Sequence, residues 1–161
     1  MADVAAKPVT RRRALAVGTI HLGKEAFRAV ADGTLAKGNA LAIAEIAGIQ
    51  AAKATASLLP LCHPIALSRV VIYPRLDAER EAVRVYCVCE IAERTGVEME
   101  ALNGVSVALL NIWDLTKPLN PALEISDVKL LFKSGGKRGE WQHPDGLSTE
   151  AQEILAGHSE A

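Results

Sequence analysis

The pattern of apolar and polar residues predicts a strand and two helices in the first third of the chain. Residues 12–21 alternate imperfectly, as a strand does, and residues 24–33 have an amphipathic helical pattern that ends near a glycine. Residues 40–59 are apolar almost all round, which is typical of a helix buried on several sides. Asn39 is placed to cap the start of this helix, and Pro60 ends it.

The pattern after Pro60 predicts three more strands and one long helix. Residues 66–78 and 81–93 are predicted as strands joined by a polar turn, and the alternation in the second predicts a sheet with one buried face. Residues 97–117 carry large apolar side chains at helical spacing. Residues 122–136 predict a final strand that runs into glycines.

This order of elements, β-α-α-β-β-α-β, indicates an α+β fold. We expect a ferredoxin-like sandwich, in which helices pack on one face of an antiparallel four-stranded sheet. Residues 1–141 are predicted as a single catalytic domain with an extended arm at residues 1–10. Residues 142–161 are predicted as a polar tail, where Thr149 and Gln152 suggest the capping box of a weakly held helix.

Composition narrows the classes of function. Half of the 161 residues are hydrophobic and mostly small, so we expect some apolar surface to end in a subunit interface. A net charge of −1 argues against a nucleic-acid binder. Three cysteines without framework spacing indicate a reducing compartment. No signal peptide or membrane-spanning stretch is expected, so we predict a soluble cytoplasmic protein.

The stretch LLPLCHPI places Cys62 and His63 side by side between two prolines. The prolines favour an extended, stiff connector between a helix and a strand. A zinc site is one interpretation, because two further cysteines lie two apart on one strand, but no CxxC pair or matched histidine spacing supports it. A nucleophile is another. The residues alone favour a cysteine that packs as a small hydrophobe and a histidine that bonds a carbonyl.

The long helix carries three acidic residues and a lysine of interest. Glu98 and Glu100 stand at its start, where acidic residues also simply stabilise a helix, and Asp114 and Lys117 are three apart, as in an ordinary surface ion pair. Helical geometry puts Glu100 and Asp114 about 40° apart on one face, which we place opposite the core stripe, and about 21 Å apart along the axis. If both serve one site, a second subunit supplies one of them, or Glu100 precedes the helix.

The stretch KSGGKRG surrounds two glycines with three cations, Lys133, Lys137 and Arg138. Such a turn can hold phosphates through backbone N–H groups and charge, although its spacing is not that of a Walker A loop. A flexible basic turn explains the same pattern. Lys37 lies beside a glycine in a similar way.

Taken together, KPVTRRRA, KGNALAIAEIAGIQAAKATASLLPLCHPI, TGVEMEAL and KSGGKRGEW closely resemble the MoaC family, the cyclic pyranopterin monophosphate synthases of molybdenum-cofactor biosynthesis. The resemblance covers roughly residues 2–141 with matching order and spacing. It implies a lyase that converts (8S)-3′,8-cyclo-7,8-dihydroguanosine 5′-triphosphate into cyclic pyranopterin monophosphate and releases pyrophosphate. It also implies a ferredoxin-like fold and a homohexamer, a trimer of dimers with pockets at the dimer interface.

The resemblance also implies roles for individual residues. The expected catalytic residues are Asp114, Lys117, Lys37 and His63. The expected substrate-binding residues are Arg12, Lys53, Leu61, Cys62, His63, Glu98, Met99, Glu100 and Lys133. The resemblance implies no metal ligand and no cofactor, and whether Mg²⁺ accompanies the triphosphate stays open.

Some positions depart from the usual family pattern. Asn39 stands where aspartate is common, Asn103 and Gly104 replace a Thr-Ala pair, Trp113 replaces a tyrosine, and Arg138 stands where serine is typical. None removes a chemical group that the implied reaction needs, so we expect them to affect fine specificity.

Two other functions stay open at this stage. A non-catalytic ferredoxin-like regulatory module that binds a small anion at its dimer interface would keep the fold and the basic turns. It would not require Asp114, Lys117, His63 and Glu100 to converge around one pocket. A zinc-dependent hydrolase would use Cys62 and His63 as ligands.

Overall fold

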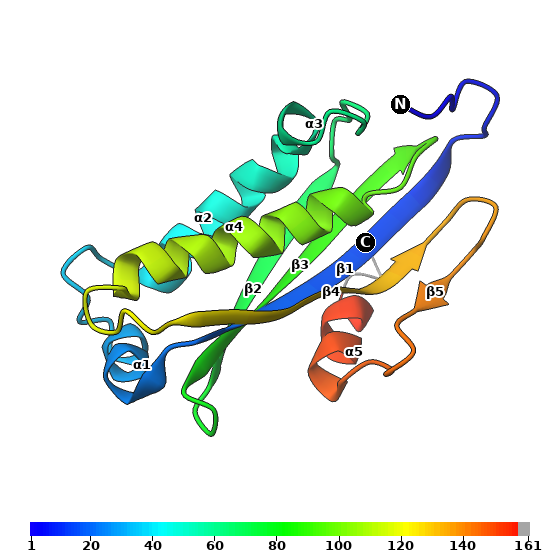
Figure 1. Cartoon of the computed structure of the whole chain (residues 1–161). Coiled ribbons are helices and arrows are strands. Elements are labelled where there is room, and N and C mark those ends of the chain that lie inside the picture. The colour runs from blue at the N-terminus through cyan, green and yellow to red at the C-terminus, as the bar shows by residue number, and fades with distance from the viewer. Residues whose placement is uncertain (158–161) are drawn as a thin grey trace.

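The computed structural model describes residues 1–157, and its centre is an antiparallel sheet (Figure 1). The sheet has five strands in the order β2-β3-β1-β4-β5. The strands are β1 Thr10–His21, β2 Arg69–Asp77, β3 Ala82–Glu93, β4 Glu124–Ser134 and the two-residue β5 Trp141–Gln142. The predicted α+β, ferredoxin-like fold is confirmed, and β5 is a short addition that the sequence pattern did not predict.

Helices α2 Ala40–Lys53 and α4 Glu98–Thr116 lie side by side across one face of the sheet (Figure 1). Glycines let their backbones approach closely, because a Cβ on Gly48 would come 2.9 Å from the carbonyl oxygen of Gly104. Helix α1 Gly23–Ala31 packs at the end of the sheet near the C-terminus of α4, and α3 Thr55–Leu58 lies at the opposite end (Figure 1). No helix in residues 1–157 is long and apolar enough to cross a membrane.

Helix α2 is less buried than its composition predicts. Asn39 caps it as expected, since its side-chain oxygen accepts hydrogen bonds from the N–H groups of Leu41 and Ala42. However, small residues face the core, while Ile43 and Ile46 are 36% and 59% exposed. The helix also ends at Lys53, and α3 forms a separate turn before Pro60. The expected burial on several sides is therefore wrong for the single chain.

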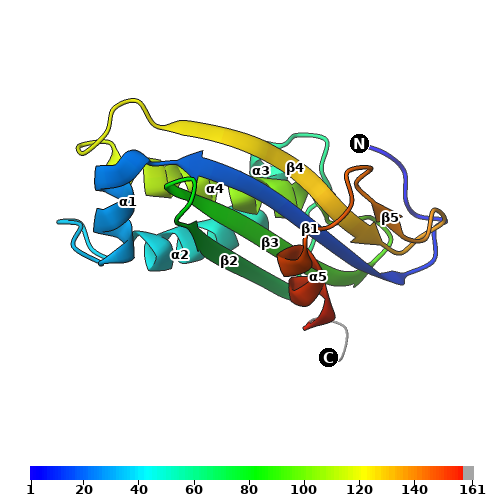
Figure 2. The same cartoon turned by 90° about the horizontal axis from the view of Figure 1, so that it is seen from below.

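The second face of the sheet is also covered. Helix α5 Thr149–Ala156 packs there (Figure 2), and its Ile154 lies in a cluster with Leu15 of β1 and Tyr86 of β3. The prediction that β3 has one buried face is therefore wrong, because α5 buries side chains on the other. Its N-cap is Ser148, whose hydroxyl accepts from the N–H of Ala151, and not the predicted Thr149. Where the catalytic domain ends stays a prediction.

Candidate active site

Three of the predicted catalytic residues meet at the C-terminal end of α4. Lys117 Nζ lies 2.6 Å from one carboxylate oxygen of Asp114, and Lys37 Nζ, from the loop between α1 and α2, lies 3.4 Å from the other. We call these three residues the Asp114 cluster. Hydrogen bonds from Lys117 and then Lys37 lower the pKa of Asp114 below its usual value. The cluster thus combines an ionised base with two ammonium groups.

A cavity adjoins this cluster. Its volume is about 710 Å³, and it lies between α1 and the end of α4. Lys37 lines it together with Lys24 and Arg28 of α1 and with Leu115 of α4. A small polar molecule at the cluster therefore has space beside it.

The connector around Cys62 and His63 forms a second site. Leu59 has an extended backbone, as Pro60 requires, and a pocket of about 340 Å³ opens beside the connector. Lys53, His63 and Glu100 line it, and we call it the connector pocket. His63 Nε2 lies 2.9 Å from the carbonyl oxygen of Ala2, which agrees with the expected histidine–carbonyl bond.

The acidic group in the connector pocket is buried. Glu100 is only 4% exposed, and this burial, with smaller repulsion from Glu98, raises its pKa above the usual value. The prediction that Glu100 lies on a face opposite the core stripe is wrong: Glu100 and Gly104, one turn later, are both buried, because α2 packs against that part of α4. A buried carboxyl whose pKa is shifted by its surroundings is a common feature of functional sites.

Three other predicted contact residues, Leu61, Cys62 and Met99, do not line this pocket but are close in sequence to its lining residues His63 and Glu100. Leu61 and Met99 are exposed apolar side chains, at 72% and 42%. Burial and the nearby Glu100 raise the pKa of the Cys62 thiol, which disfavours the reactive thiolate form. These properties fit a Cys62 that only contacts the substrate, and they do not support a role as a nucleophile.

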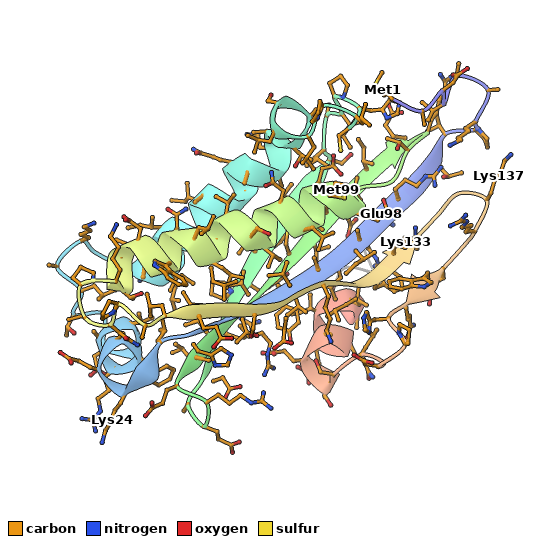
Figure 3. The ribbon with its side chains drawn as sticks, viewed as in Figure 1. Met1, Lys24, Glu98, Met99, Lys133 and Lys137 are labelled. Carbon is orange, nitrogen blue, oxygen red and sulfur yellow. The ribbon has the colours of Figure 1, made fainter. Side chains whose placement is uncertain are left out.

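A third site, the basic pocket, has a volume of about 550 Å³ between the ends of β1, β3 and β4. Its polar lining includes Lys7, Arg12, Arg13, Arg94, Glu98, Lys133, Lys137 and Arg138. Lys133 Nζ lies 2.8 Å from a carboxylate oxygen of Glu98, and Figure 3 shows these two residues facing each other. The N-terminus of α4 also opens here, so both the cations and the helix dipole favour an anionic ligand.

The Asp114 cluster and the two pockets with Glu98 and Glu100 lie at opposite ends of α4. Figure 3 places Met99 and Lys133 at one end and Lys24 of α1 at the other. Glu100 is inside the helix, so the alternative in which it precedes the helix is wrong. Fourteen helical residues separate Glu100 from Asp114 by about 21 Å. One chain therefore does not bring Asp114 together with His63 and Glu100.

Sequence reasoning missed Lys7 and Arg94 as lining residues of the basic pocket. Neither stands in a pattern of its own. They reach the pocket because β1 pairs with β3 and β4, which places Thr10 opposite Glu93 and Arg13 opposite Ser134. The positions of Lys7 and Arg94 in the pocket follow only from how the strands pair, and the sequence pattern does not show this.

Two departures from the usual family pattern have structural roles. Asn39 caps α2, as described above. The Asn103 side-chain amide donates hydrogen bonds to the carbonyl oxygen of Ala51, at 2.7 Å, and to the Thr55 hydroxyl, at 3.1 Å. Both therefore hold α2 and its surroundings in place.

A metal site gains no support from the geometry. Within residues 1–157, no group of three or more His, Cys, Asp or Glu side chains could hold a metal ion. Cys87 and Cys89 have their sulfur atoms 3.7 Å apart in the core, and both are fully buried. Nothing in this part of the chain adds ligands to Cys62 and His63 for the zinc-hydrolase alternative.

Comparison with known proteins identifies the family. The model of the MoaC family matches residues 1–136. The chain belongs to the MoaC family. This MoaC-family match covers the Asp114 cluster, the connector pocket and most of the basic pocket, of which Lys137 and Arg138 lie just beyond it.

Relatives within the MoaC family cover most of the chain. The chain is 45% identical over 141 residues to a cyclic pyranopterin monophosphate synthase of Heliobacterium modesticaldum. The aligned region covers 88% of this chain and 89% of that protein. The chain is 43% identical over 142 residues to one of Parvibaculum lavamentivorans, with 88% and 89% covered. It is 44% identical over 141 residues to molybdenum cofactor biosynthesis protein 1 of Mus musculus, with 88% of this chain but only 22% of that longer protein covered.

Proposed function

We propose that this chain is a cyclic pyranopterin monophosphate synthase, a lyase of molybdenum-cofactor biosynthesis. It converts (8S)-3′,8-cyclo-7,8-dihydroguanosine 5′-triphosphate into cyclic pyranopterin monophosphate and releases pyrophosphate. The observation that carries the proposal is the similarity, along almost the whole chain, to MoaC-family proteins of similar length that bear this name.

The triphosphate binds in the basic pocket. Arg12 and Lys133 are its principal cations, and the N-terminus of α4 adds backbone N–H groups. Negative charge builds up on the departing pyrophosphate, so fixed cations at this position stabilise the transition state. The pocket is supported as the phosphate site by its lining, in which Glu98 is the one acidic side chain beside seven cations among residues 1–157.

The Asp114 cluster performs acid–base chemistry on the guanine-derived ring. Opening that ring and closing the pterin require proton transfers to and from nitrogen and carbon. Asp114 accepts protons as an ionised carboxylate, while Lys117 and Lys37 carry protons that they can donate. His63 and the buried Glu100 serve the same substrate from the connector pocket.

The complete site combines residues from two copies of the chain. The distance along α4 between Glu100 and Asp114 supports this, because one small substrate does not span it. Exposed apolar residues on the helix layer, among them Ile46 and Leu110, offer the surface for a dimer. The assembly we propose is a homohexamer, a trimer of dimers.

No protein-bound cofactor is part of this proposal, and Mg²⁺ enters, if at all, with the triphosphate. The proposed location is the cytoplasm. Three cysteines without a disulfide, Cys62, Cys87 and Cys89, suit its reducing conditions.

The direct test supplies the cyclised GTP intermediate to purified, assembled protein and measures pyrophosphate. We expect multiple turnovers from the wild-type chain and a rate at least about a hundredfold lower from the Asp114→Asn variant. Binding of the intermediate without pyrophosphate release would instead support the regulatory-module alternative and contradict the proposal.

A mixing experiment tests the shared site. Asp114→Asn and Glu100→Gln subunits, each nearly inactive alone, are co-expressed with different tags and purified as mixed assemblies. In a random mixture half of the dimers are mixed and each has one intact site, so about a quarter of the sites regain activity. No recovery in mixed assemblies would contradict a site built from two copies.

A further inference from the structure

The side chain of Arg12 is held at one edge of the basic pocket by two main-chain oxygens. Its Nε donates to the carbonyl oxygen of Glu93 at 3.2 Å, and its Nη2 donates to that of Arg94 at 3.4 Å. A guanidinium group has five N–H donors, so these two bonds leave three for a ligand. Within residues 1–157, no carboxylate forms an ion pair with Arg12 that would occupy them.

The guanidinium of Arg12 occupies space that is open only because one neighbouring residue is glycine. Gly136 has a φ of +73°, and a Cβ built on it would overlap Nη1 of Arg12 and come 2.7 Å from Cζ and 2.9 Å from Nη2. All three are atoms at the end of a flexible side chain. An added methyl group would therefore displace the guanidinium and not the main chain.

The neighbouring glycines have other reasons to be glycine. A Cβ on Gly135 would overlap the carbonyl oxygen of Arg11, which is main chain that cannot move aside easily. A Cβ on Gly139, at a φ of +62°, would meet nothing within 4 Å. Gly135 thus serves the fold, Gly139 serves only its own backbone conformation, and Gly136 is the one in contact with the guanidinium.

We propose that Gly136 is a positioning residue for the reaction: its missing side chain keeps the space in which Arg12 presents its remaining donors to the substrate phosphates. The inference rests on the proposed function, which gives Arg12 the role of a phosphate contact. A guanidinium binds phosphate through two N–H groups in a fixed plane, so a small displacement breaks the match.

The first test compares Gly136→Ala with Gly139→Ala. Both variants place alanine at a positive φ in the same loop, but only the first meets Arg12. We expect Gly136→Ala to raise KM for the cyclised GTP intermediate about tenfold, the loss of one charge-assisted contact, and to lower kcat as well, because Arg12 also stabilises charge on the departing pyrophosphate. Gly139→Ala should keep both constants within about twofold. Equal KM values for the two variants would overturn the proposal.

A second test asks whether the effect acts through Arg12. In an Arg12→Ala background, adding Gly136→Ala should leave KM unchanged, because the clash and the contact are both gone. A further tenfold rise in that background would contradict the inference. If Gly136→Ala alone does not fold, recovery of folding in the double variant supports the steric relation, and failure to recover contradicts it.

A third measurement separates this inference from the proposed function. The NMR signal of Arg12 Nε–H, assigned by its loss in Arg12→Lys, should shift in Gly136→Ala and stay in place in Gly139→Ala. Inorganic tripolyphosphate should move the same signal in the wild-type protein. If the wild-type protein shows these NMR shifts but no turnover, the synthase proposal is refuted while the positioning of Arg12 by Gly136 stands. If the Arg12 signal does not move in Gly136→Ala, that positioning role is refuted.

Discussion

The ammonium group of Lys117 lies 2.6 Å from a carboxylate oxygen of Asp114, three residues earlier on α4. Both side chains are more than half exposed, at 54% and 56%. An ion pair this exposed adds little to stability. Its value is chemical, because it holds an ionised carboxylate beside a proton donor at the surface where substrate arrives.

Replacing Asp114 by asparagine should slow catalysis strongly and leave the fold intact. We expect turnover to fall by about 10² to 10⁴, the usual contribution of a general base. The side chain is exposed, so the thermal unfolding midpoint should not change. Pyrophosphate release and a thermal melt on the same sample check both parts. Full turnover from folded Asp114→Asn protein would remove this residue from the mechanism.

The pKa of Asp114 should depend most on Lys117. Hydrogen bonds from Lys117 and then Lys37 lower it, so Lys117→Met should raise the pKa of Asp114 more than Lys37→Met does. A lowered pKa means that the carboxylate stays ionised, and its small contribution to stability persists, until the pH falls through that pKa. An NMR titration of the Asp114 carboxyl carbon measures the order of the two shifts. The reverse order would contradict the assigned cause.

The buried carboxyl of Glu100 should make stability fall with rising pH. Its pKa is raised in the folded protein, so the folded state holds the proton more tightly than the unfolded chain does. The favourable contribution is complete below the unfolded value and is lost as the pH rises through the folded pKa. Glu100→Gln has no proton to lose there, so its urea midpoint should decline less than that of the wild type as the pH is raised from below the ordinary carboxyl pKa value of 4.5.

The control for this measurement is Glu45→Gln, since Glu45 is an exposed residue of α2. It should follow the wild-type decline. A decline of wild-type size in Glu100→Gln would show that another group causes it.

Cys62→Ala should retain most of the activity. The raised pKa keeps the thiol neutral, and the connector gives it only a contact role, so we expect kcat/KM within about tenfold of wild type. His63→Ala should cost more, because it removes a group that can transfer a proton or bind phosphate. Complete loss of turnover in Cys62→Ala, with His63→Ala still active, would favour a covalent role for the thiol.

Ile154→Ala should destabilise the protein by about 2–5 kcal/mol, the usual cost of removing a buried isoleucine side chain. Ile154 is 6% exposed and packs with the second cluster of core residues. Its exposed neighbour Glu153, replaced by alanine, should change stability by less than about 0.5 kcal/mol. Denaturant unfolding measures both. Near-equal midpoints would mean that the C-terminal helix is held as weakly as its polar sequence suggests.

Local interactions explain which expectations the structure confirmed. Asn39 caps α2 through N–H groups two and three residues away, and Leu59 is extended because Pro60 follows it. Asp114 and Lys117 meet because they are one turn apart on a helix. The alternation of apolar residues likewise predicted the four main strands and their order along the chain.

What the sequence by itself determined is therefore the main elements, the ferredoxin-like order and the chemical groups available, since each depends on neighbours within about one turn or one strand. Only the tertiary structure decided where those groups lie. Packing of α2 against α4 buries Glu100, and α5 buries the second face of the sheet. Pairing of β1 with β3 and β4 brings Arg12 beside Arg94 and Gly136. These contacts join residues more than forty positions apart, and periodicity along the chain carries no information about such pairs.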